Sequence, residues 1–255
     1  MTQRYKITIE YNGQNYSGWQ RQPHAMTIQQ AVEEAIRKFS SQDVAITVAG
    51  RTDAGVHALG QVANFDLEEM KKPLNPFQIM KAINAHLVPQ PISVVHVEEV
   101  HSEFNARFDA LNKLYRYRVI NRNAFLTHDR GLAWLLKYPI DVDAMREGAK
   151  HLLGNHDFTT FRDSECQAKS PIRTLDRLDI AVKEYDAHGG KEIVFEIEGK
   201  SFLHHQVRNM VGTLSLVGRG KWHPKDMIGA LEAKNRAAGG PTCPADGLYL
   251  VRIDY

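Results

Sequence analysis

The chain has 255 residues, 43% of them hydrophobic, which is enough for one large domain or two modest ones with a buried core. Its first residues lack the features of a signal peptide, and no run approaches the roughly 18 apolar residues of a membrane span, so we expect a cytoplasmic protein that is not inserted in a membrane. Cys166 and Cys243 lie far apart and outside any CxxC pattern, which argues against a disulfide framework or a zinc site.

Basic side chains are concentrated in two stretches, although the formal net charge is only +2. Residues 107–122 contain five lysines and arginines against one acid, and residues 200–225 contain five, with three histidines and no acid. Such stretches are typical either of a surface that faces a polyanion or of solvated strand and helix faces. Charge alone leaves both interpretations open.

The first half of the sequence predicts six elements. Strict alternation of polar and apolar residues in "RYKITIEY" predicts a strand with one buried face. An apolar stripe in "TIQQAVEEAIRKF", opened by a capping box of Thr27 and Gln30, predicts a helix. The remaining elements are strands at 43–49 and 61–66, a helix from Asn75-Pro76 to Leu87, and a strand in "ISVVHVEEV". The order β-α-β-β-α-β is that of a ferredoxin-like unit.

The second half repeats this order of elements without repeating the sequence. Its expected elements are a strand at 113–121, helices at 141–153, 202–217 and 224–235, a hairpin of "LDRLDIAVKEY" and "KEIVFEIE", and a last strand, "LYLVRIDY". We therefore expect an α+β fold of two ferredoxin-like (βαββαβ) units, residues 1–106 and 107–255. The two would form one broad, mainly antiparallel sheet with helices packed behind it and a central active-site cleft.

The segment "AGRTDAGVHALGQVANF", residues 49–65, carries the strongest candidate for chemistry. Asp53 suits a tight turn in which its carboxylate caps backbone N–H groups, but Arg51, His57 and several glycines surround it, and glycines let a ligand approach closely. The segment lacks the GxxxxGK[ST] and GxGxxG patterns of phosphate-binding loops, and Asp53 with His57 is a weak pair for a metal site. A lone carboxylate beside arginines suits nucleophilic or general-base chemistry.

Two further segments offer binding side chains. In the expected strand "KLYRYRVI", Tyr115 and Tyr117 share one face and Arg116 and Arg118 the other. Such tyrosines are either core residues or a platform for a stacked base. On the expected helix that starts at residue 202, Arg208 is either a surface ion-pair partner or a buried arginine that keeps a catalytic carboxylate ionised.

Several segments together resemble the TruA family of tRNA pseudouridine synthases. Besides the segment around Asp53, they are "YNGQNYSGWQRQ", "FNARFDALNKLYRYRV", "HDFTTFRDSECQAKSPIRT", "FLHHQVRNMVG" and "GPTCPADGLYLVRIDY", in family order along essentially the whole chain. The resemblance implies an isomerase that converts uridine to pseudouridine in the anticodon stem-loop region of tRNA, at positions 38–40. It also implies a homodimer that uses neither a metal nor a small-molecule cofactor.

The resemblance also assigns roles to residues. It makes Asp53 the catalytic aspartate, Tyr115 the tyrosine that stacks on the flipped-out base, and Arg208 the arginine that keeps Asp53 ionised. As candidates for contacts to the RNA we expect Arg51, Arg21, Lys113 and Arg116. Whether Asp53 attacks C1′ or C6, or acts as a base, is left open.

Two other functions fit the sequence less well. A non-catalytic RNA-binding protein on the same scaffold would have no need of Asp53, Tyr115 and Arg208 together. A metal-dependent hydrolase that uses Asp53 and His57 would need more ligands than the segment supplies. The role of His57 is left open.

Overall fold

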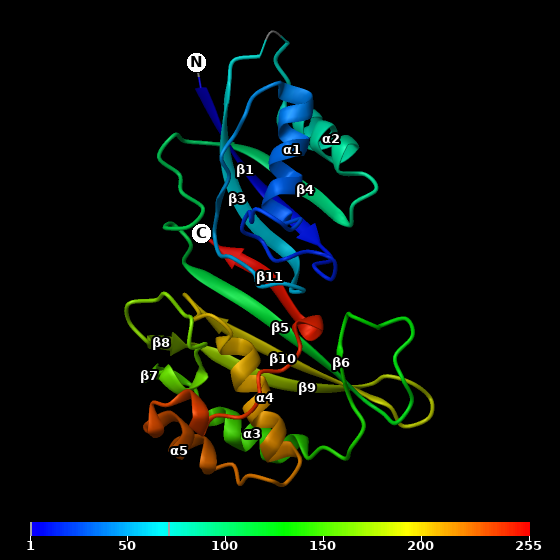
Figure 1. The fold of residues 1–255 in the computed structure, drawn as a ribbon, viewed down its shortest axis with the longest axis vertical. Coiled ribbons are helices and arrows are strands. Elements are labelled where there is room, and N and C mark those ends of the chain that lie inside the picture. The colour runs from blue at the N-terminus through cyan, green and yellow to red at the C-terminus, as the bar shows by residue number, and fades with distance from the viewer. Residues whose placement is uncertain (1, 71) are drawn as a thin grey trace. The chain divides into compact units, whose positions relative to one another are not determined.

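The computed structural model describes residues 2–70 and 72–255, which form two compact units (Figure 1). The first unit is the chain up to Leu111 together with Tyr249–Tyr255, and the second is Asn112–Leu248. The division expected from the sequence lies between residues 106 and 107 and leaves the C-terminal strand in the second part. The compact units differ from this expected division in two places, since both residues 107–111 and the C-terminal strand from Tyr249 onward belong to the first unit. The assignment of functions to the two expected parts stays a prediction.

The first unit contains a mainly antiparallel sheet and two helices. Its elements are β1 (Thr2–Tyr11), α1 (Ile28–Ser40), β2 (Thr47–Val48), β3 (His57–Glu68), α2 (Pro76–Leu87), β4 (Ile92–Val100) and β11 (Leu248–Asp254). β1 pairs antiparallel with both β3 and β4, while β2 (antiparallel) and β11 (parallel) share the other edge of β3. α1 and α2 pack together, and α2 packs against β4. The β-α-β-β-α-β order expected for this part of the chain is confirmed.

Local sequence explains why these elements form. Alternate residues of β1 from Tyr5 to Tyr11 are buried, as the polar and apolar alternation predicts. The side chain of Thr27 accepts the N–H of Gln30 at 3.3 Å and so caps α1. Asn75 opens α2 through a complete capping box, with proline at the first helical position.

In the second unit the strands pair in the order β5-β10-β9, with β6 parallel to β5. Its elements are β5 (Asn112–Asn121), β6 (Trp134–Leu136), α3 (Val142–Lys150), β7 (Gly154–Asp157), β8 (Ile172–Leu175), β9 (Arg177–Glu184), β10 (Lys191–Gly199), α4 (Gln206–Gly218) and α5 (Asp226–Ala233). The hairpin of β9 and β10 confirms the expected one, whereas β6 and the β7–β8 ribbon have no counterpart among the expected elements. Within residues 2–70 and 72–255, no helix is long and apolar enough to cross a membrane.

Helix α4 forms the centre of the second unit's core. Its residues Met210, Val211 and Leu214 are almost completely buried. On the same helix, Gly212 lies so close to the carbonyl of Pro241 that a Cβ at this position would overlap it. This close approach brings the segment after residue 240 against the helix that carries Arg208.

We expect Gly212→Ala to lower the free energy of unfolding by about 1–3 kcal/mol, because the added methyl group would push α4 away from Pro241. Alanine forms helices better than glycine by about 1 kcal/mol, so the destabilisation caused by the clash has to exceed this gain in helix propensity. Gly229→Ala in α5 measures the gain in helix propensity alone, since a Cβ there meets no atom within 4 Å. This variant should raise the free energy of unfolding. Urea unfolding measures both. Equal stability of the two variants would contradict the close approach.

Candidate active site

Asp53 lies in the loop of residues 50–56 that leads from β2 into β3, here called the Asp53 loop. The loop is short because β3 begins at His57 and not at residue 61 as expected. The N–H of Val56 donates to the carbonyl of Asp53 at 3.1 Å, and Gly55 has a φ of 78°. The turn expected around Asp53 is therefore present and is closed through its backbone, while its side chain is half-buried.

The segment of residues 12–19 holds the Asp53 loop through backbone hydrogen bonds. The N–H of Trp19 donates to the carbonyl of Thr52 at 3.0 Å, and the N–H of Gly55 donates to the carbonyl of Tyr16 at 3.2 Å. Gly18, with a φ of 83°, lies so close that a Cβ would come within 2.7 Å of the Thr52 carbonyl oxygen. Because the bonds lie on both sides of Asp53, a segment distant in sequence fixes the position of its backbone.

Two buried side chains, Tyr11 and Thr52, form a polar contact next to Asp53. Their hydroxyl oxygens are 2.8 Å apart, and the side-chain amide of Gln61 donates to the carbonyl of Gly50 at 2.8 Å. Burial raises the pKa of Tyr11 to about 12, and the negative charge of Asp53 makes a smaller contribution in the same direction. Tyr11 therefore keeps its proton at neutral pH and acts as a hydrogen-bonding group. Sequence reasoning missed this contact, although Tyr11 ends the predicted buried face of β1.

His57 is the first residue of β3 and only 1% exposed. Its Nδ1 accepts the N–H of Gly13 at 3.1 Å. Its ring stacks on Tyr249, with centroids 4.6 Å apart and planes at 22°. An imidazole held in this way has a structural environment, which does not favour the metal-dependent hydrolase that would use it as a ligand.

Tyr115 and Tyr117 lie on the same face of β5, as the alternation predicts, but their environments differ. Tyr117 is fully buried, its hydroxyl donates to the carbonyl of Pro244 at 2.7 Å, and burial raises its pKa well above the usual value. Tyr117 is therefore a core residue. The ring of Tyr115 meets that of Phe202 edge-on, with centroids 5.1 Å apart, and 8% of the residue stays exposed. Only Tyr115 keeps some of the accessible surface that a stacking partner needs.

Arg208 lies in the first turn of α4 and is half-buried. Its Nε donates to the carbonyl of Cys243 at 2.8 Å, and the N–H of Cys243 donates to the carbonyl of Arg208 at 3.3 Å. Burial raises the pKa of the Cys243 thiol to about 12, so this cysteine is protonated and unreactive at neutral pH. The carbonyl of Cys243 thus fixes the Nε end of the Arg208 guanidinium. Its expected approach to Asp53, which belongs to the other unit, stays a prediction.

An Asp163–His205 pair fixes the start of α4, and sequence reasoning did not identify it. Asp163 Oδ2 lies 2.6 Å from Nδ1 of His205, and the N–H of Asp163 donates to the carbonyl of His204 at 3.0 Å. His205 itself has a left-handed backbone with a φ of 59°. A hydrogen bond from the N–H of Glu165, assisted by His205, lowers the pKa of Asp163 below its usual value. The only sequence signal was the position of both residues in segments that resemble the family.

We expect Asp163→Asn to lower the free energy of unfolding at pH 7 by about 1 kcal/mol. Because the pKa of Asp163 is lowered in the folded protein, its carboxylate stabilises the fold above the unfolded-state pKa, and this contribution is lost as the pH falls through the folded-state value. The variant and the parent should therefore converge in acid. Denaturant unfolding across pH measures this. Asp43→Asn is the control, since Asp43 is 92% exposed and 3.9 Å from Arg37. A deficit that stays constant in acid would contradict the prediction.

Two of the expected RNA contacts lie in the first unit. Arg51 is exposed in the Asp53 loop. Arg21 is half-exposed, and its Nη2 lies 2.7 Å from Oε2 of Glu33, a nearly buried carboxylate that also accepts the N–H of Ile46. Part of the charge of Arg21 is therefore balanced inside the protein, whereas Arg51 presents its charge to solvent.

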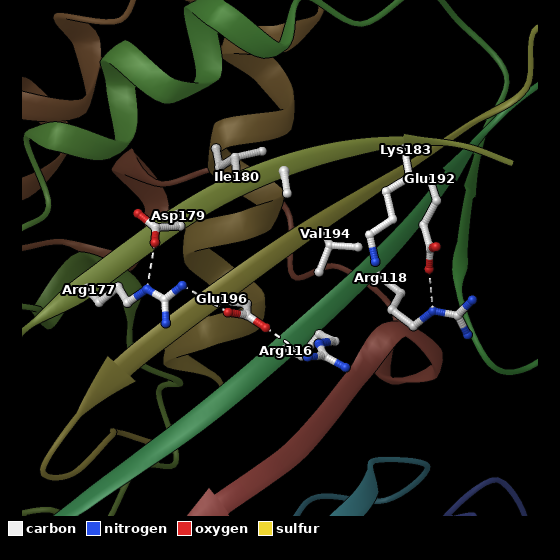
Figure 2. A pocket seen from close by; sticks show the side chains of 10 residues that line it. Arg116, Arg118, Arg177, Asp179, Ile180, Lys183, Glu192, Val194 and Glu196 are labelled. Carbon is white, nitrogen blue, oxygen red and sulfur yellow. Dashed lines mark hydrogen bonds and ion pairs between the residues drawn. The ribbon is translucent and has the colours of Figure 1, made fainter.

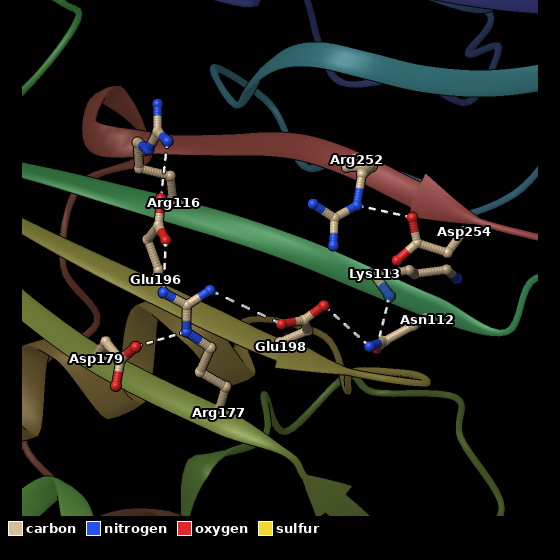
Figure 3. Close-up of polar contacts among 9 residues, drawn as sticks. All are labelled: Asn112, Lys113, Arg116, Arg177, Asp179, Glu196, Glu198, Arg252 and Asp254. Atoms are coloured by element: carbon tan, nitrogen blue, oxygen red, sulfur yellow. Dashed lines mark hydrogen bonds and ion pairs between the residues drawn. The ribbon is translucent and has the colours of Figure 1, made fainter.

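The other two expected RNA contacts, Lys113 and Arg116, lie on opposite faces of β5. Alternation places Lys113 on the face of Tyr115 and Arg116 on the outer face of the sheet. There, Nη2 of Arg116 lies 2.7 Å from one oxygen of Glu196, and Arg177 lies 3.0 Å from the other (Figure 3). The structure thus groups Lys113 with Tyr115 and does not group Arg116 with them.

The outer face of β5, β9 and β10 forms an open pocket of about 350 Å³ (Figure 2). Its polar lining alternates in sign, with Arg116, Arg118, Arg177 and Lys183 against Asp179, Glu192 and Glu196. Arg118, for example, lies 2.7 Å from Glu192 on the neighbouring strand. Because the arginines of β5 meet acids of β10, the interpretation of a solvated strand face holds for this part of the 107–122 stretch.

Comparisons with known proteins identify the family to which the sequence belongs. The sequence profile of a family described as tRNA pseudouridine synthase matches residues 7–109 and 149–255. Proteins named tRNA pseudouridine synthase A are 51% identical in Parvibaculum lavamentivorans, over 99% of both chains, and 50% identical in Dinoroseobacter shibae, over 99% of this chain and 96% of that protein. A solved structure of a Cbf5-Nop10-Gar1 complex aligns with a TM-score of 0.34 at 13% identity, over 96% of this chain and 57% of that one. On the strength of the profile and the two relatives, the chain belongs to the tRNA pseudouridine synthase family, whose members are isomerases that act on uridine in tRNA.

Proposed function

We propose that the chain converts uridine to pseudouridine in the anticodon stem-loop region of tRNA, at positions 38–40, with Asp53 as the catalytic residue. The observation that carries the proposal is the Asp53 loop, whose backbone is fixed on both sides of a half-buried carboxylate. When the fold already holds a catalytic group in place, the reaction does not have to bear the entropic cost of positioning that group. A protein that only binds RNA gains nothing from this arrangement.

The chemistry needs one well-placed carboxylate and space for a base. The N1–C1′ glycosidic bond breaks, the uracil turns, and a C5–C1′ bond forms, so the base first has to leave the helical stack. The reaction balances without a co-reactant, because C5 loses a proton and N1 gains one. Asp53 attacks C1′ or C6, or removes a sugar proton, and all three routes use its ionised form.

Tyr115 and Arg208 complete the proposed machinery. Tyr115 stacks on the flipped-out base and is the candidate acceptor of the C5 proton. A tyrosine hydroxyl keeps its own proton at neutral pH and is then a weak base. To accept the C5 proton, Tyr115 therefore needs a neighbouring group that helps its hydroxyl lose that proton. Arg208 keeps Asp53 ionised and oriented, and the fixed position of its Nε supports such a role because it limits where the rest of the guanidinium lies.

We also propose that the protein works as a homodimer in the cytoplasm without a metal or organic cofactor, as the family resemblance implies. Light scattering of the purified protein tests the dimer directly. Activity that survives dialysis against EDTA supports the metal-free reaction. Activity lost on chelation and restored by a metal would overturn that part of the proposal.

The function is tested by mapping pseudouridine on an unmodified tRNA transcript after incubation with the purified protein. We expect pseudouridine at positions 38–40 where the transcript carries uridine there. A matched transcript with cytidine at these positions should stay unmodified. Pseudouridine at other positions would overturn the proposed specificity, and none on any transcript would overturn the proposed function.

We expect Lys113→Gln to reduce the slope of log K for tRNA binding against log salt by about 1, as the loss of one phosphate contact would. Arg116→Gln is the matched control on the same strand and should leave the slope unchanged, because Arg116 pairs with Glu196 on the outer face. Filter binding at several salt concentrations measures both slopes. A reduced slope for Arg116→Gln alone would show that the RNA follows the outer face of β5.

A further inference from the structure

His57 is a buried polar residue that the proposed mechanism does not use. Its contacts include the hydrogen bond from the N–H of Gly13 to Nδ1 at 3.1 Å and the stack on Tyr249. A backbone N–H only donates, so Nδ1 has to present its lone pair. The ring is therefore neutral, with its proton on Nε2. A protonated ring would place two N–H groups against each other and break the contact.

Gly13 is the point at which the segment of residues 12–19 meets the beginning of β3. A Cβ on Gly13 would overlap the carbonyl of Val56, so the two backbones are in direct contact. The same segment bonds the Asp53 loop through Tyr16 and Trp19. The contact between His57 and Gly13 is thus the side-chain member of a set of attachments between this segment and the loop that carries the aspartate.

We propose that His57 is a positioning residue for Asp53. By accepting the N–H of Gly13, its imidazole fixes the segment of residues 12–19, and that segment fixes the Asp53 loop. The proposal rests on the proposed function, in which Asp53 is the catalytic residue. It gives the histidine that follows the Asp53 loop a task for which a buried, neutral side chain with a fixed acceptor is needed.

The strength of the expected effect follows from the geometry of catalysis. A reacting group displaced by about 1 Å can lose about 10²-fold in rate even when substrate binding is unchanged. Releasing the N–H of Gly13 removes the hydrogen bond between the segment and His57 but leaves the bonds to Thr52 and Gly55 and the bond from Asn12 to Pro91. The loop should therefore still form and hold Asp53 less precisely, which lowers the rate of the chemical step more than the affinity for tRNA.

Two substitutions separate the hydrogen bond from the packing. His57→Phe keeps a ring to stack on Tyr249 and removes the acceptor, whereas His57→Asn keeps an acceptor and removes the ring. We expect His57→Phe to lower the single-turnover rate at saturating enzyme by about 10²-fold while tRNA affinity changes a few-fold at most. His57→Asn should recover most of this rate although it is the less stable of the two. His96→Phe, at an exposed site on β4, is the control and should match the parent.

A purely structural role predicts the opposite order, with the rate following stability. If His57→Phe keeps the parental rate, or if both variants lose it equally, the proposal is overturned. Activity in Asp53→Asn would instead overturn the proposed function, so the two failures are distinguishable. Should His57→Phe not fold, nitrogen-15 NMR of the histidine-labelled parent reads the tautomer directly, with His57→Asn assigning the signal. Nδ1 without a proton supports the proposal, and a protonated Nδ1 overturns it.

Discussion

Asp53→Asn should lower the single-turnover rate of pseudouridine formation by about 10⁴-fold or more, the scale on which enzymes lose rate when a nucleophile or general base is removed. Asparagine has nearly the shape of aspartate, and the backbone bond that closes the turn, from the N–H of Val56 to the carbonyl of residue 53, stays available. The Asp53 loop should therefore keep its conformation. What is lost is the negative charge and the nucleophilic oxygen.

Release of tritium from C5 of uridine in labelled tRNA measures the reaction, and filter binding measures the affinity. We expect tRNA affinity to change a few-fold at most. Asp43→Asn is the control, because Asp43 is an exposed aspartate of the same unit and should keep the parental rate. Turnover near the parental rate in Asp53→Asn would contradict the catalytic role, and a loss found entirely in affinity would make Asp53 a binding residue.

The parts of the fold that the sequence predicted well are those set by local rules. Alternation in β1, the caps at Thr27 and Asn75, and the hairpin of β9 and β10 each depend on residues close together in the chain. β6 and the β7–β8 ribbon were missed because they are only three or four residues long. Strands this short owe their pairing to distant segments, and periodicity in so few residues carries little information.

The same distinction applies to the candidate site. Sequence placed Tyr115 and Arg116 on opposite faces of β5 correctly, because side chains of a strand alternate. It could not show that Arg116 meets Glu196, since that pair depends on the register between β5 and β10. Counting charges along one stretch overlooked acids on a neighbouring strand. The outer face of β5 is consequently less basic than the count along the stretch suggested, which favours the interpretation of a solvated strand face.

The contacts around Asp53 were hidden for the same reason. Tyr11 with Thr52, and Gly13 with His57, are pairs of residues far apart in sequence that are joined by single hydrogen bonds. No periodic pattern reports such pairs. The sequence predicted which loop carries the chemistry, but how that loop is held became visible only in three dimensions.

Arg208→Met should lower the single-turnover rate by about 10²–10³-fold, the scale found when one charged or polar group that stabilises the reacting centre is removed. If Arg208 keeps Asp53 ionised, its loss makes protonation of the carboxylate easier. The acidic limb of the pH–rate profile should then move to higher pH, and part of the lost rate should return as the pH is raised. Arg208→Lys keeps the charge but not the Nε–H that bonds Cys243, so we expect an intermediate rate with a smaller shift.

Arg219→Met provides the control, because Arg219 is an exposed arginine directly after the same helix and should leave both the rate and the pH profile unchanged. Single-turnover rates from pH 5 to 9, with tRNA affinity measured in parallel, separate the possible roles. A loss confined to affinity would make Arg208 a phosphate contact. A slower reaction whose pH profile is not displaced would mean that Arg208 acts on the substrate, since an arginine that sets the ionisation of Asp53 cannot be removed without moving the pH at which the carboxylate gains its proton.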